Sequence, residues 1–572
     1  MPSIVPLAPL RAASSMSTPV LPMGHRVGGA LRPIGEVAED LGLEPGELTP
    51  AGNGILRIPV REVRARASAS RRGKLVLVTA MTPTEHGEGK TVVAIGLAMA
   101  LRRRGRRSVV CLRQPSLGPV FGAKGGASGG GRSAVEPRVQ IDLGFTGDLD
   151  AITNAQNLLA TFVDNHIFQG NPEGIDPTRP ELPRASPLED RALRDITSGL
   201  TAKAPGFPRP AQFVITPATE MAAIHALASD YADLKHRIDR MTVARGAGGS
   251  PITAAQLGAT ESVASLFGVA LEPNLVQTVE GTPALVHGVP YANVAHGTCS
   301  RLAMELGLSG ADFCVVEAGF SSDLGAEKFV DLVSPQTGLS ADVAVIVATV
   351  RAIRWHGSLP APAGPPVDPI AEGLENLDQH ISNLRRMGLD PIVALNRFPS
   401  DTVEEIARVA AFCAGRKLAF AAVSAFAEGG AGAEELADRV VEAAGRGQRS
   451  HALYAPNARV EEILETVVTA VYGGAAVVLS ESARADLERI RRDGGSEGPV
   501  CVAKTPLSLS TDAQLRGRPR GFTVSIRRLT RWTGAGFTVA IAGPIVAMPG
   551  LPAHPSADSI HFDDEGGVTG LG

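Results

Sequence analysis

One short segment of the chain has the residue types and the spacing needed to hold a phosphate group. The run Val76–Ala80 predicts a buried strand, and the apolar run Val92–Leu101 predicts the helix after it. Between them lies a turn that ends in Gly89-Lys90-Thr91. Backbone N–H groups at a helix start point toward a bound anion, and the helix dipole adds positive charge. Lys90 would reach the β- and γ-phosphates and the Thr91 hydroxyl would hold Mg²⁺, so this segment predicts ATP binding.

The match to the full phosphate-loop pattern is incomplete. That pattern has a glycine five residues before Gly89, and Thr84 occupies the position in this chain. An ordinary strand-to-helix turn that happens to contain glycines is the alternative interpretation. Because a strand precedes the turn and a helix follows it, we favour the phosphate site. The residues predicted to bind the nucleotide are Thr84, Gly87, Glu88, Gly89, Lys90 and Thr91, with Thr91 also the predicted metal ligand.

Composition and charge exclude several functional classes. The chain has 572 residues, of which 44% are hydrophobic and 20% charged, a mixture typical of a globular protein. The net charge of −4 argues against nucleic acid as the main partner. Apolar runs fall short of the roughly 18 residues that a membrane helix needs, so no membrane partner is expected. The five cysteines are widely spaced and odd in number, which favours reduced thiols and a cytoplasmic location.

Strand-like and helix-like segments alternate along most of the chain. Ser108–Leu112, Phe313–Val316 and Val343–Thr349 are among the predicted buried strands, and Glu220–Leu234 is among the predicted helices. Alternation of this kind predicts the α/β class. We expect a P-loop NTPase-like domain with a mostly parallel sheet, together with two smaller α/β domains.

The predicted domain boundaries follow changes in composition. Residues 1–30 are rich in Pro, Ser, Ala and Arg and are interpreted as a disordered N-terminal extension, although a transit peptide would share that composition. We expect the nucleotide-binding and catalytic domain at 31–360, the second α/β domain at 366–450 and the third at 456–572. A cluster of prolines within Leu359–Asp368 marks the boundary between the catalytic domain and the second α/β domain.

A second glycine-rich segment follows the predicted strand Ser108–Leu112. It runs from Gly118 to Gly131, with Arg113 just before it and Lys124 within it. So many glycines cost conformational entropy, and they are tolerated where the backbone must approach a ligand closely. A flexible surface loop is the alternative. The two cationic side chains and the apolar surroundings favour a ligand site.

At these residues the chain resembles the formate–tetrahydrofolate ligase family, from about Arg32 to the C-terminus. The segments that carry the resemblance are Thr82–Thr91, Leu112–Gly131, Phe145–Asp148, Asp164–Asn171, Pro273–Thr278, Glu317–Phe320, Asn396–Pro399, Leu515–Pro519 and Met548–Pro552. The resemblance implies a cytoplasmic homo-oligomer, a tetramer or a dimer. It also implies ATP, Mg²⁺, formate and tetrahydrofolate as ligands, and help from a monovalent cation such as K⁺.

The resemblance further implies roles for individual residues. The γ-phosphoryl group of ATP would move to formate, and N10 of the folate would then attack formyl phosphate, with Lys90 and Arg113 as catalytic residues. Arg113 matches a family arginine that grips formyl phosphate, and Phe320 matches an aromatic residue that stacks on the pterin. Phe426 stands where the family has a tryptophan, and its face still suits stacking. Asp148 either orients Mg²⁺ or a substrate, or caps the helix that follows it. The predicted substrate residues are Arg113, Lys124, Asp148, Phe320 and Phe426.

Several positions depart from the family pattern. Gln114 stands in place of a glutamate, Asp150 in place of a histidine and Glu428 in place of a lysine. Our main hypothesis is the ligation of formate to tetrahydrofolate, which gives 10-formyltetrahydrofolate, ADP and phosphate. The departures motivate a second hypothesis, a diverged paralogue that activates another small carboxylate or uses another acceptor. The third hypothesis is a non-catalytic nucleotide-binding subunit. The presence of both Lys90 and Arg113 argues against it.

Overall fold

The computed structural model describes residues 31–68, 73–123, 125–126, 128–179, 181–200, 208–358 and 368–571. The predicted N-terminal extension, Lys124 and the proline-rich stretch 359–367 lie outside the described residues.

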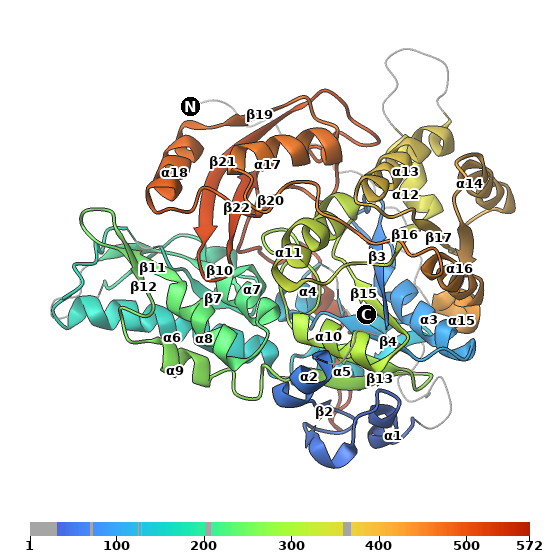
Figure 1. The fold of residues 1–572 in the computed structure, drawn as a ribbon, viewed down its shortest axis with the longest axis horizontal. Coiled ribbons are helices and arrows are strands. Elements are labelled where there is room, and N and C mark those ends of the chain that lie inside the picture. Colours follow the sequence, from blue (N-terminus) through green and yellow to red (C-terminus); the bar gives the residue numbers. More distant parts are fainter. Residues whose placement is uncertain are drawn as a thin grey trace.

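A large sheet forms the centre of the molecule (Figure 1). Its strands lie in the order β1-β2-β13-β14-β4-β15-β3-β16-β17-β18, and from β14 to β18 neighbouring strands are parallel. Their bounds are β1 Thr49–Pro50, β2 Leu56–Arg57, β13 Asn274–Thr278, β14 Pro283–Val286, β4 Ser108–Leu112, β15 Phe313–Glu317, β3 Lys74–Ala80, β16 Val343–Ala348, β17 Ile392–Asn396 and β18 Phe420–Val423, with β5 Gly129–Gly130 and β6 Ser133–Glu136 beside β13. This sheet confirms the predicted α/β class.

The apolar run in β3 is continuous because both of its faces are covered. Val76 lies in the core shared with α3 (Lys90–Arg103), whereas Leu77 lies in the core shared with α10 (Arg301–Gly310). Both side chains are fully buried. Parallel strands in such layers are apolar at successive positions and do not alternate. Strand β3 ends at Ala80, at the carboxyl edge of the parallel sheet, and α3 begins at Lys90 after the intervening turn.

The other helices surround this sheet or extend from it. Their bounds are α1 Ile34–Glu39, α2 Val60–Ala67, α4 Leu117–Phe121, α5 Arg138–Asp142, α6 Asp148–Phe168, α7 Glu220–Leu227, α8 Tyr231–Arg240, α9 Thr260–Ser265, α11 Ser334–Thr337, α12 Val350–Gly357, α14 Val403–Gly415 and α15 Ala425–Glu428. Small two-stranded sheets pair β7 Arg184–Ser186 with β10 Phe213–Ile215, β8 Ile196–Ser198 with β9 Arg209–Ala211, β11 Thr242–Arg245 with β12 Pro251–Thr253, and β23 His561–Phe562 with β24 Val568–Thr569. Within the described part of the chain, no helix combines the length and the apolar character needed to cross a bilayer.

The strands between residues 366 and 450 continue the large sheet. Here α13 (Pro369–Arg386) and α16 (Glu434–Ala444) accompany β17 and β18. Strand β17 pairs with β16, and β18 pairs with β17, both in parallel. The strands of the predicted second domain thus lie in the same sheet as those of the predicted first domain.

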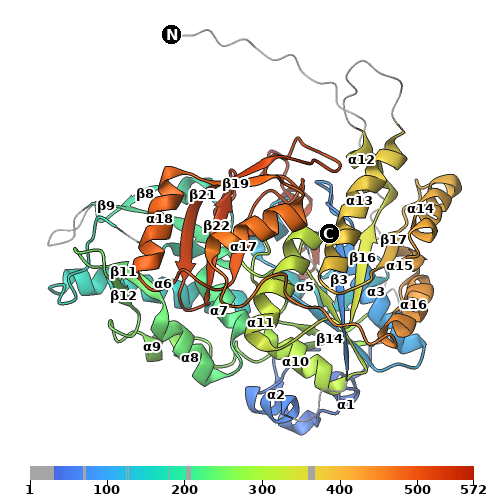
Figure 2. The same ribbon diagram turned by 45° about the horizontal axis from the view of Figure 1, so that its top comes forward.

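The C-terminal part of the chain forms a sheet of its own. The order is β19-β21-β22-β20, with α17 and α18 packed beside it. The bounds are α17 Val460–Thr466, β19 Ala476–Leu479, α18 Glu481–Arg492, β20 Val500–Ala503, β21 Thr523–Trp532 and β22 Phe537–Ala542. Figure 2 shows this orange-to-red unit on the side of the molecule away from α14 and α16.

The predicted single helix Glu220–Leu234 is two helices, so that prediction was wrong. Helix α7 ends at Leu227 and α8 begins at Tyr231. Between them Asp230 caps α8, because its carboxylate accepts the N–H of Asp233 at 2.9 Å. An aspartate that bonds to nearby backbone favours a helix start over a helix interior.

Helices α12 and α13 pack with their backbones in contact, which leads to a stability prediction. A Cβ at Gly373 would lie far inside van der Waals contact of the Ile353 carbonyl. We expect Gly373→Ala to lower the free energy of unfolding by about 1–3 kcal/mol because it overpacks this contact. Gly415→Ala is the matched control, since a Cβ there meets no atom within 4 Å. Chemical denaturation of both variants checks this, and equal midpoints would contradict it.

Candidate active site

The turn between β3 and α3 has a backbone that only glycine adopts readily. Gly87 and Gly89 are in the left-handed region, with φ of 72° and 74°. Gly89 is the N-cap of α3, and Lys90 is the first helical residue. A side chain at Gly89 would also overlap the amide of Asn396, at the end of β17. Both the φ angle and the lack of space therefore require glycine at position 89.

Glu88 holds this turn together from the inside. Its buried carboxylate accepts the Thr84 N–H at 2.7 Å and the Thr84 hydroxyl at 2.8 Å. The Thr349 hydroxyl donates to the other carboxylate oxygen. Asn396 Nδ2 donates to the Glu88 carbonyl at 3.1 Å. Of the predicted nucleotide-binding residues, Thr84 and Glu88 thus use their side chains within the turn.

Glu317, the last residue of β15, interacts with the start of α3. The Thr91 hydroxyl donates a hydrogen bond of 2.7 Å to Glu317 Oε2. Burial of the ammonium group lowers the pKa of Lys90, while the negative charges of Glu317 and Glu88 act in the opposite direction. The helix start therefore carries a cation and a hydroxyl group next to one carboxylate.

Arg113 follows β4 and approaches the second oxygen of the same carboxylate. Its Nη2 lies 3.9 Å from Glu317 Oε1, and its Nη1 donates to the Pro290 carbonyl at 3.3 Å. Strands β4, β15 and β3 are neighbours and parallel, so their carboxyl ends lie along one edge of the sheet. Ligands of α/β proteins bind at such an edge. The structure thus brings the predicted residues Lys90, Thr91 and Arg113 together.

Phe320 has an uncommon backbone conformation close to Arg113. Its φ is 58°, in the left-handed region that bulky residues rarely adopt. The Tyr291 ring meets the Phe320 ring edge-on, with 6.2 Å between centroids. A Cβ on the neighbouring Gly319 would lie 3.2 Å from Arg113 Nη2. Backbone strain of this kind is concentrated at functional sites, which is compatible with the predicted contact to a substrate.

Phe426 lies against the glycine-rich segment that follows Arg113. Its side chain is 56% exposed, so its ring is available for stacking. A side chain on Gly131 would overlap the Phe426 backbone, which explains a glycine there. The structure thus places Phe426 beside this segment and Phe320 beside Arg113. Lys124 lies outside the described residues, and its contact with a substrate stays a prediction.

Asp148, the first residue of α6, is buried and supports the chain next to Arg113. Its Oδ2 accepts the Gly288 N–H at 2.9 Å, and its Oδ1 accepts the Asn274 amide at 3.0 Å. The Gly288 carbonyl in turn accepts the Gln114 N–H at 2.8 Å. Asp148 is therefore connected to the residue after Arg113 through a single intervening residue.

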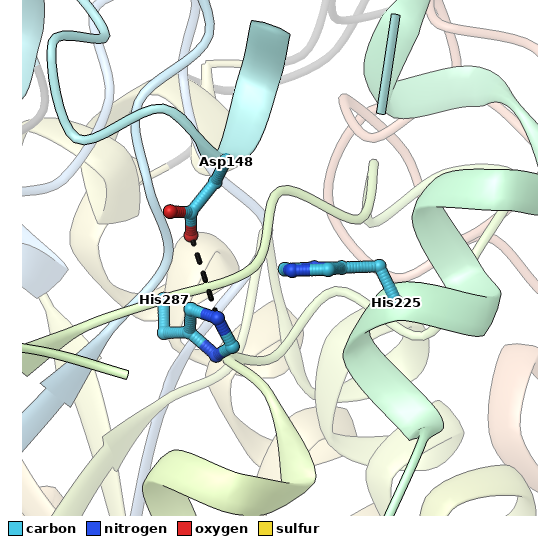
Figure 3. Close-up of side chains that lie close together, drawn as sticks. All are labelled: Asp148, His225 and His287. Atoms are coloured by element: carbon cyan, nitrogen blue, oxygen red, sulfur yellow. Dashed lines mark ion pairs between the residues drawn. The ribbon is translucent and has the colours of Figure 1, made fainter. Parts of the chain in front are cut away.

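Two histidines lie beside Asp148 (Figure 3). One ligand atom from each of Asp148, His225 and His287 lies within 4.8 Å of the others, an arrangement that metal sites share. The Ala270 carbonyl lies 2.7 Å from His225 Nε2 and 3.0 Å from His287 Nε2. Burial lowers the pKa of His225 to about 4, so its ring is neutral near pH 7. The ring N–H groups that face this carbonyl offer no lone pair there, and His287 Nδ1 lies 2.6 Å from the Ser300 hydroxyl, so both nitrogens of His287 are in hydrogen bonds. His225 Nδ1 is buried without such a partner. With His287 engaged, we interpret this cluster as a hydrogen-bonded support.

Two residues of this site were missed by the sequence analysis as functional groups. Glu317 ends β15 and Asn396 ends β17. A polar residue at the carboxyl end of a buried apolar run is the signal that points to them, because parallel strands deliver such residues to one edge. Their partners at the start of α3 depend on which strands are neighbours, and local sequence does not contain that information.

The fold and the geometry define the class: an α/β protein with a candidate anion site at the carboxyl edge of a parallel sheet. A family model described as formate–tetrahydrofolate ligase matches residues 27–572. A formate–tetrahydrofolate ligase of Thermus thermophilus is 48% identical over 541 residues, which are 95% of this chain and 98% of the relative. The ligases of Methylobacterium sp. (strain 4-46) and Methylobacterium nodulans are 46% and 45% identical over 547 residues, with the same coverage. The chain belongs to the formate–tetrahydrofolate ligase family.

The lowered pKa of Lys90 predicts that nucleotide binding takes up protons at alkaline pH. A bound triphosphate favours the charged ammonium and so raises this pKa, and a proton is taken up between the two pKa values. Affinity for Mg-nucleotide should therefore fall as the pH rises through the lowered value. Titration calorimetry in buffers of different ionisation enthalpy measures this uptake. Lys90→Arg is the control, because its guanidinium stays charged; equal uptake by that variant would assign the proton to another group.

Proposed function

We propose that this chain catalyses the ATP-dependent ligation of formate to tetrahydrofolate. The products are 10-formyltetrahydrofolate, ADP and phosphate, and formyl phosphate is the intermediate. The observation that carries the proposal is the meeting of Lys90, Thr91, Glu317 and Arg113 at the carboxyl ends of β3, β15 and β4. Membership of the family over nearly the whole chain supports the choice of substrates.

In this proposal the turn before α3 binds the phosphates of ATP. The start of α3, from Gly89 on, presents backbone N–H groups to the phosphates. The Gly87 N–H donates to the Thr84 carbonyl at 3.2 Å, and this bond and the Glu88 side chain keep the turn in shape. The Lys90 ammonium adds the positive charge that the transferring phosphoryl group needs. Phosphoryl transfer depends on positioning and charge neutralisation more than on covalent help from the protein.

Thr91 and Glu317 are proposed to hold Mg²⁺. Both offer oxygen, the donor atom that this small hard cation prefers. Because the Thr91 hydroxyl donates its hydrogen bond to Glu317, the lone pairs of the Thr91 oxygen remain available. When bound, the ion neutralises part of the negative charge on the phosphates.

Arg113 is proposed to bind the oxyanions of formate and of formyl phosphate. A formate oxygen attacks the γ-phosphorus as ADP leaves, and N10 of the folate then attacks the formyl carbon as phosphate leaves. A planar guanidinium matches such oxyanions with paired N–H donors. We propose that Phe320 and Phe426 stack on the pterin and that Lys124 contacts the substrate. Asp148 is proposed to affect substrate binding indirectly. Its carboxylate holds Gly288, which in turn accepts the N–H of Gln114, the residue after Arg113.

Three finer features remain proposals that rest on the family resemblance. These are a homo-oligomer, either tetramer or dimer, activation by a monovalent cation such as K⁺, and a cytoplasmic location. The paralogue with another carboxylate or acceptor and the non-catalytic subunit are not favoured, because relatives named formate–tetrahydrofolate ligase are 45–48% identical over 95% of the chain.

Removal of the Lys90 ammonium tests the proposed reaction. We expect Lys90→Ala to lower formate-dependent ADP release by at least about 100-fold, since a clamp on the transferring phosphoryl group is lost. Circular dichroism should show an unchanged fold. The control is Lys235→Ala, whose ammonium pairs with Glu261 on the surface. Full activity of Lys90→Ala would contradict the proposed role of Lys90 in phosphoryl transfer.

The same assay on the unaltered chain separates the hypotheses. Turnover that needs both formate and tetrahydrofolate supports the ligase. ADP release with a different carboxylate would point to the paralogue, and ATP binding without turnover would point to the non-catalytic subunit.

The proposed metal site predicts a changed Mg²⁺ requirement in Glu317→Gln. Loss of the carboxylate should raise the Mg²⁺ concentration for half-maximal rate about tenfold or more, a size typical of altered metal surroundings. The KM for tetrahydrofolate should stay the same. Rates measured against Mg²⁺ concentration at fixed ATP check this, with the exposed Glu85→Gln of the same turn as control. Identical curves for the two variants would contradict the site.

A further inference from the structure

Thr82, near the start of the phosphate-binding turn, is held by two buried histidines. Thr82 follows β3 closely, and its N–H donates to His380 Nε2 at 2.9 Å. His356 Nε2 lies 3.0 Å from the Thr82 carbonyl oxygen. Both imidazole side chains and Thr82 are fully buried. Each backbone polar group of Thr82 thus has its own imidazole partner, one from α13 and one from α12.

The backbone donors determine the tautomer of each ring. An amide N–H only donates, so His380 Nε2 accepts from Thr82, and its Nδ1 carries the proton toward Ser322 Oγ at 2.8 Å. The Gly517 N–H donates to His356 Nδ1 at 3.2 Å, so His356 Nε2 carries the proton that goes to the Thr82 carbonyl. Both rings are neutral in this arrangement, with opposite tautomers.

The electrostatic surroundings agree with two neutral rings. Burial lowers the pKa of both His356 and His380 to about 4. The charged or titratable groups that face His380 are Asp323, Lys504 and Arg518, and those that face His356 are His380, Glu88 and Arg516. Either ring, once protonated, would turn an N–H toward a backbone N–H, and that hydrogen bond would be lost.

Asn376 connects the same turn to a segment far away in the chain. Its Nδ2 donates to the Gly517 carbonyl at 2.7 Å and to the Thr82 hydroxyl at 3.0 Å. Gly517 therefore binds both His356 and Asn376, and through them it is connected to Thr82. Its neighbours dock on the same helices, since Arg516 stacks on Trp355 at 3.5 Å.

We propose that His356, His380 and Asn376 are positioning residues that hold Thr82, and with it the phosphate-binding turn, in the conformation that binds nucleotide. Through these side chains the segment 515–519 supports the nucleotide site. The inference rests on the proposed function of the turn. Its physical basis is preorganisation, because a turn that is ordered before binding does not lose that entropy on binding.

The test removes each link and measures nucleotide affinity. We expect His380→Leu and His356→Leu to weaken binding of a Mg-bound, non-hydrolysable ATP analogue about tenfold. The His356 variant leaves the Thr82 carbonyl unpaired, and the His380 variant leaves the Thr82 N–H only its longer contact of 3.3 Å with Asn376 Oδ1. In steady state the KM for ATP should rise while the KM values for formate and tetrahydrofolate stay the same. Glutamine offers both an acceptor and a donor, so the glutamine variants should recover most of the affinity.

The control is a histidine that makes a similar hydrogen bond elsewhere. His166 Nε2 accepts the Glu173 N–H at 3.1 Å at the end of α6, and His166→Leu should leave nucleotide affinity unchanged. Should the leucine variants fail to fold, Asn376→Ala removes the link to Gly517 and keeps both histidines, and it should show the same ATP-specific loss.

The outcomes separate this inference from the proposed function. Leucine and alanine variants that fold and bind the analogue as tightly as the unaltered chain would overturn the positioning role. A loss that glutamine does not recover, or that affects all three substrates equally, would also overturn it. If the unaltered chain itself does not bind the Mg-bound analogue, the proposed function of the turn fails first, and this inference fails with it.

Discussion

The site depends on one carboxylate at the end of a central strand. Glu317 accepts a hydrogen bond from the Thr91 hydroxyl and faces the Arg113 guanidinium, and its charge favours the ammonium form of Lys90. An ammonium group without such a partner would tend to lose its proton when buried. Because β15 lies between β4 and β3, the order of the strands decides that these groups meet.

The turn at the start of α3 is supported by contacts from outside itself as well as by the bonds between Thr84 and Glu88. Gly89 lies against Asn396, Glu88 accepts from Thr349, and Thr82 lies between His356 and His380. Asn396 ends β17, Thr349 follows β16, and the two histidines belong to α12 and α13, all of which come much later in the chain. A backbone with two left-handed glycines is costly to order, so this external support is what makes the turn a defined site.

One departure from the family pattern, Gln114, has hydrogen-bond partners that suit an amide. Gln114 is buried where the family has a glutamate, and its Nε2 donates to the Ile141 carbonyl at 2.6 Å. Its Oε1 accepts the Thr146 hydroxyl at 2.7 Å. An ionised carboxylate at this position has no donor for the carbonyl, whereas the amide satisfies both neighbours. The replacement thus agrees with its surroundings.

The sequence by itself determined the α/β class, the bounds of strands such as Ser108–Leu112 and the presence of the turn before Lys90, because these follow from apolar periodicity and glycine spacing. It did not determine the break at Asp230, where a capping carboxylate competes with a helical pattern. Only the tertiary structure decided that Glu317, Asn396 and the two histidines surround that turn. Their meeting depends on strand order and helix packing, which arise from contacts between residues hundreds of positions apart.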